Sequence, residues 1–211
     1  MANGMRTRTA RTHSAILKAA ERLFLKHGYL DVAMDQVAAE AKVSKQTIYA
    51  HFQNKESLFM EFVRQRTGIA GDTLAEAVRD EPYDPALQSY LLRFAEKQVS
   101  IVLTPDLMHL RRLAISEASR FPEFGRLLHR MGPGRSIGRL EKAFRHYRSL
   151  GQMTAKDLGE AASNFNWLLM GGPSNDAMML GTDAIPTKAN LQRHAEECVR
   201  VFMAAYGLSS E

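Results

Sequence analysis

The chain has 211 residues, enough for one large domain or two small ones with a sizeable buried core. Apolar residues make up 45% and charged residues 24%, as in folded globular proteins, and no run of about 20 apolar residues predicts a membrane span. The single cysteine, Cys198, excludes an intramolecular disulfide framework and a cysteine-based zinc site. Because the basic, polar N-terminus is also unlike a secretory signal, we expect a cytoplasmic protein.

The net charge of +5 is concentrated near the N-terminus. Residues 1–66 hold eleven Lys or Arg and six Asp or Glu, whereas the remaining residues hold seventeen of each. A basic module on a neutral body indicates that this module binds a polyanion, although a charge of this size is also common on proteins that do not.

The first third of the chain has the pattern of four helices. A helix over residues 12–27, ending at Gly28, is followed by short helices over 34–41 and 45–52. Arg6, Arg8 and Arg11 precede the first helix as an arm, which either reaches a minor groove or stays a solvated tail.

Capping residues mark the boundaries of these helices. Ser44 is the predicted N-cap of the helix over 45–52, and Asn54 caps a long fourth helix.

Beyond residue 80, prolines and capping side chains mark further helix starts. The predicted starts are Asp84-Pro85, Thr104-Pro105, Pro122, Pro133 and the pair Thr154/Asp157. Gly151 and Gly207 end helices, and Gly171-Gly172-Pro173 is expected to kink or break the penultimate one. With a last helix over residues 187–206, the prediction is an all-α protein of nine to ten helices.

The two short helices and their three-residue connection form a candidate helix-turn-helix. Ile48 and Phe52 anchor the second helix, which leaves polar side chains on its outer face. Lys45 suits phosphates, Gln46 can pair bidentately with adenine, and Thr47 can contact a base through its hydroxyl or methyl group.

The same stretch resembles the DNA-binding domain of TetR-family transcriptional regulators over about residues 12–60. The resemblance rests on Ala20-Glu-Arg-Leu-Phe24, Gly28-Tyr29, Met34-Asp-Gln-Val-Ala38, Val43-Ser44-Lys45, Thr47-Ile48-Tyr49 and His51-Phe52-Gln-Asn-Lys55-Glu-Ser-Leu58. It implies a homodimer with a helix-turn-helix domain over residues 1–54, including the basic arm, and a ligand-binding and dimerisation domain over 55–211. Family members are usually repressors that leave a palindromic DNA operator when a small molecule binds. An activator or architectural factor without a ligand switch is the alternative.

The resemblance places the recognition helix on residues 44–51 and gives phosphate contacts to Tyr49, His51 and Lys55. The predicted DNA-binding residues are Lys42, Ser44, Lys45, Gln46, Thr47, Tyr49, His51 and Lys55. Three positions depart from the family pattern. Ala33 replaces a capping Ser or Thr, Lys42 replaces a turn glycine, which is expected to strain the backbone, and Gln46 replaces a glycine, which makes it the candidate specificity residue.

The C-terminal part resembles the AefR-like domain of the same family over about residues 106–180. The shared features are Arg111-Arg112-Leu113, Ser116-Glu117-Ala118, Arg120-Phe121-Pro122-Glu123 and the Gly132-Pro133 turn. By this resemblance a small, largely apolar effector binds between the fourth helix and those that follow. The candidate lining residues, each of which also suits an ordinary core, are Phe62, Arg66, Phe94, Met108, Arg112, Phe144, Trp167 and Met170. Arg66 and Arg112 would pair with an acidic ligand or with Glu117.

The resemblance also implies that the last two helices form a four-helix bundle with those of a second copy. The predicted dimer-interface residues are Ala161, Phe165, Leu168, Leu191, Cys198 and Phe202. The sequence has no nucleophile–base constellation, phosphate loop or metal-ligand spacing, so we expect neither an enzyme nor a metal or cofactor site.

Overall fold

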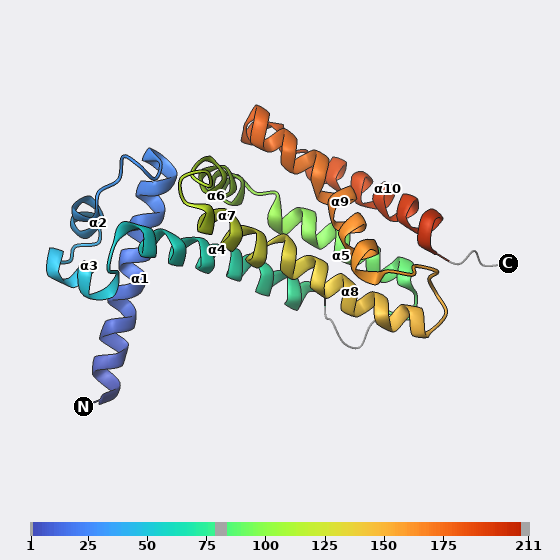
Figure 1. Ribbon diagram of the computed structural model, residues 1–211, viewed down its shortest axis with the longest axis horizontal. Coiled ribbons are helices and arrows are strands. Elements are labelled where there is room, and N and C mark those ends of the chain that lie inside the picture. Colours follow the sequence, from blue (N-terminus) through green and yellow to red (C-terminus); the bar gives the residue numbers. More distant parts are fainter. Residues whose placement is uncertain (1, 79–83, 208–211) are drawn as a thin grey trace. The chain divides into compact units, whose positions relative to one another are not determined.

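The protein is all-α, as predicted. The structure is a computed structural model that describes residues 2–78 and 84–207, with side chains from residue 8 onward. In these residues the helices are α1 (Ala2–His27), α2 (Met34–Glu40), α3 (Lys45–His51), α4 (Lys55–Val78), α5 (Leu87–Val102), α6 (Pro105–Ser116), α7 (Pro122–Met131), α8 (Pro133–Ser149), α9 (Leu158–Leu180), the 3-10 helix η1 (Thr182–Ala184) and α10 (Lys188–Tyr206) (Figure 1). No helix in the described ranges has the length and hydropathy needed to cross a membrane.

The chain folds into two compact units. The first comprises residues 1–66 and 112–127, and the second comprises 67–111 and 128–211. The boundaries fall inside α4, α6 and α7, so each of these helices contributes one part to each unit. The functional boundary expected between residues 54 and 55 remains a prediction. The compact units are defined by which residues pack together, so their boundaries lie elsewhere.

Helix α1 begins ten residues before its predicted start. Residues 2–11 lack proline and contain Ala, Met and Arg, which favour helix. The helix therefore extends through them without a break. The expectation that Arg6, Arg8 and Arg11 precede the first helix is therefore wrong, and their contact with a minor groove stays a prediction.

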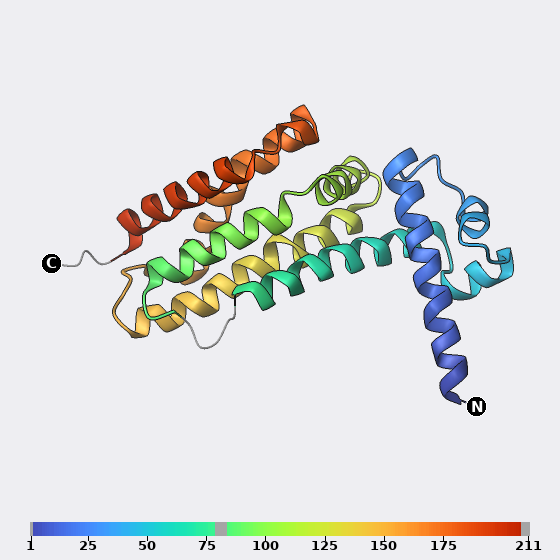
Figure 2. The ribbon, with the colours of Figure 1, turned by 180° about the vertical axis from the view of Figure 1, so that it is seen from behind.

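Aromatic side chains form the centre of each unit. In the first, Phe24 and Phe59 are in edge contact at 5.3 Å between ring centroids. In the second, Phe202 of α10 contacts Phe144 of α8 at 5.3 Å and Phe165 of α9 at 5.0 Å. The C-terminal helix α10 lies along α5, as both ribbon views show (Figure 1, Figure 2).

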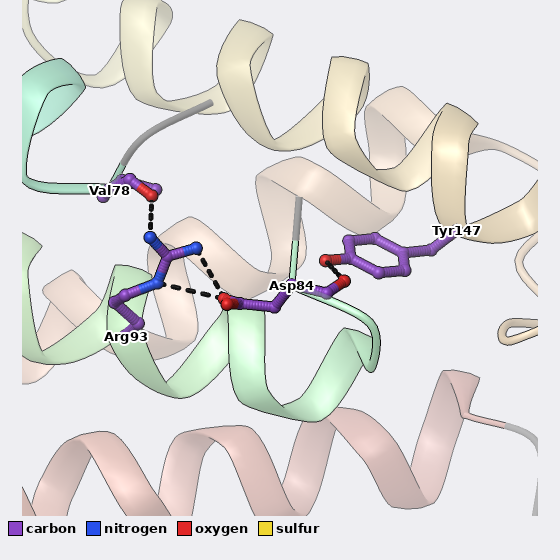
Figure 3. A network of polar contacts seen from close by, with 4 residues as sticks. All are labelled: Val78, Asp84, Arg93 and Tyr147. Atoms are coloured by element: carbon purple, nitrogen blue, oxygen red, sulfur yellow. Dashed lines mark hydrogen bonds and ion pairs between the residues drawn. The ribbon is translucent and has the colours of Figure 1, made fainter. Parts of the chain in front are cut away.

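The start of α5 differs from the prediction because Asp84 has another role. The Asp84 carboxylate accepts hydrogen bonds from Arg93, at 3.0 Å from Nε, and Arg93 also donates to the Val78 carbonyl (Figure 3). The Tyr147 hydroxyl donates to the Asp84 carbonyl at 2.8 Å. Helix α5 therefore begins at Leu87, whose backbone N–H donates to the side chain of Gln152 at 2.7 Å.

The other predicted starts agree with the structure at Pro105, Pro122 and Pro133. At α9 the cap is Asp157, whose carboxylate accepts from the Glu160 N–H at 2.9 Å. Thr154 lies outside that helix, and its backbone N–H donates to the Tyr206 carbonyl at 2.8 Å.

Pro173 does not break α9, which runs continuously from Leu158 to Leu180. Proline has no N–H to offer the carbonyl four residues earlier, which is that of Leu169. His194 of α10 lies 2.8 Å from this carbonyl through Nε2. Because a carbonyl only accepts, Nε2 must carry the proton, and α10 supplies the hydrogen bond that Pro173 cannot make.

Candidate nucleic-acid interface and ligand pocket

The helix-turn-helix presents the outer face of α3 to solvent. Ser44 caps the helix as predicted: its Oγ accepts from the Thr47 N–H at 3.1 Å and lies 2.7 Å from the Thr47 hydroxyl. Ile48 is fully buried, whereas Tyr49 is 43% exposed and Gln46 is exposed. This arrangement leaves Gln46 and Tyr49 available to DNA and holds the Thr47 hydroxyl against the cap.

The two departures beside α2 have visible structural consequences. Lys42 adopts φ +57°, the left-handed conformation that costs a side-chain-bearing residue about 1–2 kcal/mol, in agreement with the predicted strain. Ala33 has no side-chain oxygen to cap α2, but the Gln36 side chain accepts from the Ala33 N–H at 2.7 Å. One half of a capping box therefore remains.

Lys45 is an exposed cation that forms an ion pair with Asp35. Its Nζ lies 2.9 Å from the Asp35 carboxylate of α2, and this hydrogen bond raises the pKa of Lys45. Both side chains are largely exposed. Solvent screening makes such a pair weak, so a phosphate can replace Asp35 as the partner of Lys45.

Lys55 has a structural role that the sequence did not reveal. Its Nζ donates to the carbonyls of Tyr29 and Leu30 at 2.9 and 3.0 Å and lies 4.6 Å from the centre of the Tyr29 ring. Partial burial lowers the pKa of Lys55. An ammonium group has three donors, so one N–H is left for a phosphate.

His51 is half-buried beside another histidine. Its ring centroid is 5.9 Å from that of His13 on α1, and the His13 ring is 4.9 Å from that of Phe52. The predicted phosphate contact of His51 therefore sits where α1 and α3 meet. The DNA contacts of all eight residues remain predictions.

The first unit also includes parts of α6 and α7, joined to it through Tyr29. The Tyr29 ring contacts those of Phe121 and Phe124 in edge geometry, both at 5.2 Å. Burial, with Glu56 and Glu117 nearby, raises the pKa of Tyr29 to about 12. The residues at 112–127 therefore pack with the helix-turn-helix as one body.

The second unit contains a cavity of about 70 Å³. Its wall comes from α4, α5, α6, α7, α8 and α9, and every residue in the wall belongs to this unit. Most of the wall is apolar, as in ligand sites of proteins generally.

Three of the eight predicted ligand-binding residues, Met108, Trp167 and Met170, are in this wall. Phe94 and Phe144 are buried in the hydrophobic core outside it. The remaining three, Phe62, Arg66 and Arg112, belong to the first unit. There Phe62 packs in the aromatic core, and Arg66 forms an ion pair with Glu21 at 3.2 Å. The arginine of α6 that faces the cavity is instead Arg111, one residue and about 100° earlier on the helix.

Sequence reasoning missed a buried amide pair in the wall. Gln98 of α5 donates through Nε2 to Asn166 Oδ1 of α9 at 2.9 Å, and both side chains are at most 2% exposed. Gln98 follows Phe94 and Ala95 on the apolar stripe of α5, and Asn166 follows Phe165 on that of α9. The sequence feature that could have indicated this pair is a polar residue on the otherwise apolar face of each helix.

The predicted dimer-interface residues lie mainly inside the chain itself. Ala161, Phe165, Leu191, Cys198 and Phe202 are buried in the core of the second unit, because α5 and α8 cover them. Among the six, Leu168 is partly exposed. The exposed large apolar side chains of α9 and α10 are Trp167, Leu168, Met179, Leu180 and Val201.

Comparison with known proteins assigns both parts of the chain. Residues 16–62 match the family of bacterial regulatory proteins called tetR, and residues 89–208 match the AefR-like transcriptional repressor, C-terminal domain. The chain belongs to the TetR family of transcriptional regulators. A TetR-family regulator from Mesorhizobium loti is 32% identical, covers 95% of this chain and 99% of its own, and superposes with a TM-score of 0.86.

Two further relatives agree with the TetR assignment. The structure of the flavonoid-responsive regulator FrrA is 26% identical, with a TM-score of 0.78 over 95% of this chain and 100% of its own. The HTH-type transcriptional regulator YdeS of Bacillus subtilis is 46% identical over 56 residues, which are 26% of this chain and 28% of YdeS. The chain thus matches less than a third of the length of that curated relative. The protein is a DNA-binding transcriptional regulator of the TetR family.

Proposed function

We propose that this protein is a homodimeric repressor that binds a palindromic operator and is released when a small molecule enters the cavity of the second unit. The observation that carries the proposal is the cavity wall itself. Three of its helices, α4, α6 and α7, continue along the chain into the unit that contains the helix-turn-helix. A regulator without a ligand switch would not need such a cavity.

DNA binding requires two copies of α3. A dimer with two-fold symmetry places the two recognition helices in successive major grooves, about 34–36 Å apart, and therefore reads an inverted repeat. Gln46 reads a base, while Lys45 and Tyr49 contact phosphates. The operator is chromosomal DNA, which gives the protein a cytoplasmic location.

Release follows from the size of the cavity. At about 70 Å³ it is smaller than the roughly 300–1,000 Å³ of common ligand sites. An effector of ordinary size must therefore widen it. Among the six helices of the wall, α4, α6 and α7 carry such a displacement along the chain into the unit that contains the helix-turn-helix. The ligand then prefers a state in which the recognition helices are spaced differently, and this differential affinity, of about 1–3 kcal/mol, weakens operator binding. FrrA, which responds to flavonoids by its name, supports an effector of low molecular mass.

The first experiment is selection of DNA from a random library by the purified protein at two salt concentrations. We expect an inverted repeat with fixed half-site spacing, bound less tightly at the higher salt concentration. Selection of a single half-site or of no preferred sequence would contradict a dimeric operator binder. The selected DNA then becomes the probe for a screen of small molecules that release it.

A further inference from the structure

The cavity wall carries charge of one sign. Its charged residues are Arg111 of α6 and Arg135 and Arg139 of α8, and among the described residues that line it there is no Asp or Glu. Arg135 is held by Asp72 of α4, with its Nη2 2.6 Å from Asp72 Oδ1. The wall therefore places guanidinium-bearing side chains among apolar ones.

Arg111 differs from Arg135 in its surroundings. It is half-buried, and no ion pair found in the described part of the chain involves it. Burial lowers the pKa of the Arg111 guanidinium, and no carboxylate close by offsets that effect. Arginine nevertheless stays protonated, so a partly desolvated cation lines the cavity and would gain from an anionic ligand.

The amide pair supplies a second polar point. With the Gln98 Nε2–Asn166 Oδ1 bond made, Gln98 Oε1 and Asn166 Nδ2 are buried without a hydrogen-bond partner in the described residues. If both amides were turned round, one donor and one acceptor would still remain. Buried polar groups left in this way are costly and unusual in folded proteins, and a ligand hydroxyl, which both donates and accepts, satisfies the pair.

We propose that the effector is a small carboxylic acid with an apolar ring or chain, its carboxylate bound by Arg111 and a hydroxyl group bound by Gln98 and Asn166. This assignment rests on the proposed function and specifies its ligand class. The apolar wall, with Met108 and Trp167, accepts the remaining body of the acid.

The single tryptophan provides the readout, because Trp167 lines the cavity. Its fluorescence is titrated with benzoate, octanoate and 4-hydroxyphenylacetate, and with the neutral amide of each acid. We expect at least one acid to bind about ten- to a hundredfold more tightly than its own amide, the range of a hydrogen bond to a charged group. Phenylacetate is titrated as well, and we expect 4-hydroxyphenylacetate to bind more tightly than phenylacetate, which lacks the hydroxyl group.

Substitutions assign the effect to residues. Arg111→Gln should bring the acid and its amide to equal affinity, and Arg111→Lys should retain part of the preference because the charge remains. Arg130→Gln removes the same charge from an exposed position of α7 outside the wall and should change nothing. Thermal unfolding of each variant checks that the fold is kept.

Three results would overturn the proposal. These are amides that bind as tightly as the acids, the absence of binding by any of the acids, and an acid preference that survives Arg111→Gln. The first and third would leave release by a ligand intact. Selection of an operator from random DNA does not involve the cavity. The titration therefore tests the proposed class of ligand, and the DNA selection independently tests operator binding.

Discussion

The exposed residues of α3 divide into a base reader and phosphate contacts, and affinity measurements can separate them. Gln46→Ala should relax the preference at one base position of each half-site, with a loss of about 1–3 kcal/mol in discrimination, because a bidentate amide contact disappears. Tyr49→Phe should lower affinity for all sequences alike. Binding to the selected operator and to its single-base variants checks both, and an unchanged preferred sequence for Gln46→Ala would rule out a reading role.

Substitution of two lysines of the same domain should have different effects, one on stability and the other on DNA binding. Lys55→Gln removes two hydrogen bonds to the carbonyls of Tyr29 and Leu30, so we expect the free energy of unfolding to fall by about 1–3 kcal/mol. Lys45→Gln removes only an exposed pair with Asp35 and should leave the melting temperature unchanged, while the salt dependence of DNA binding falls by about one unit per half-site.

Thermal melts and salt titrations of both lysine variants make this comparison. Equal melting temperatures for the two variants would contradict the structural role of Lys55. An unchanged salt slope for Lys45→Gln would remove that residue from the phosphate contacts.

At the scale of the helices, the hydrogen bond from His194 of α10 to the Leu169 carbonyl of α9 replaces one that Pro173 cannot make. Because Pro173 leaves the Leu169 carbonyl without its helical donor, His194→Ala should leave that partly buried carbonyl without a hydrogen bond and cost about 1–3 kcal/mol of stability. In a Pro173→Ala background the new N–H supplies the bond, so the same His194→Ala substitution should cost less. A double-mutant cycle measured by denaturant unfolding tests this, and additive losses would show that the two residues act independently.

At the scale of the whole molecule, the exposed apolar face of α9 and α10 is the proposed contact with a second copy. Leu168→Glu combined with Val201→Glu places two charges on this face and should convert a dimer of twice 23.7 kDa into a monomer at micromolar concentration. Leu150→Glu is the control, since Leu150 is an exposed leucine just after α8. Light scattering gives the mass, and a dimer that survives the double substitution would place the interface elsewhere.

The sequence by itself determined those features that depend on neighbouring residues. The helical pattern, the Ser44 cap, the left-handed turn at Lys42 and the helix starts at Pro105, Pro122 and Pro133 follow from local rules of capping and steric strain. The spacing of residues 12–60 was also enough to indicate the family. Local information went wrong where a distant residue competes for a group, as Arg93 does for the Asp84 carboxylate.

Only the tertiary structure decided which side chains meet. Lys55 is tied to carbonyls 25 and 26 residues earlier, His194 serves a carbonyl of another helix, and Gln98 pairs with Asn166 across 68 residues. The same holds for the cavity, where a rotation of 100° separates Arg111 from Arg112. A helical stripe shows that one face is buried, but it does not show what covers that face, because this depends on how distant helices pack.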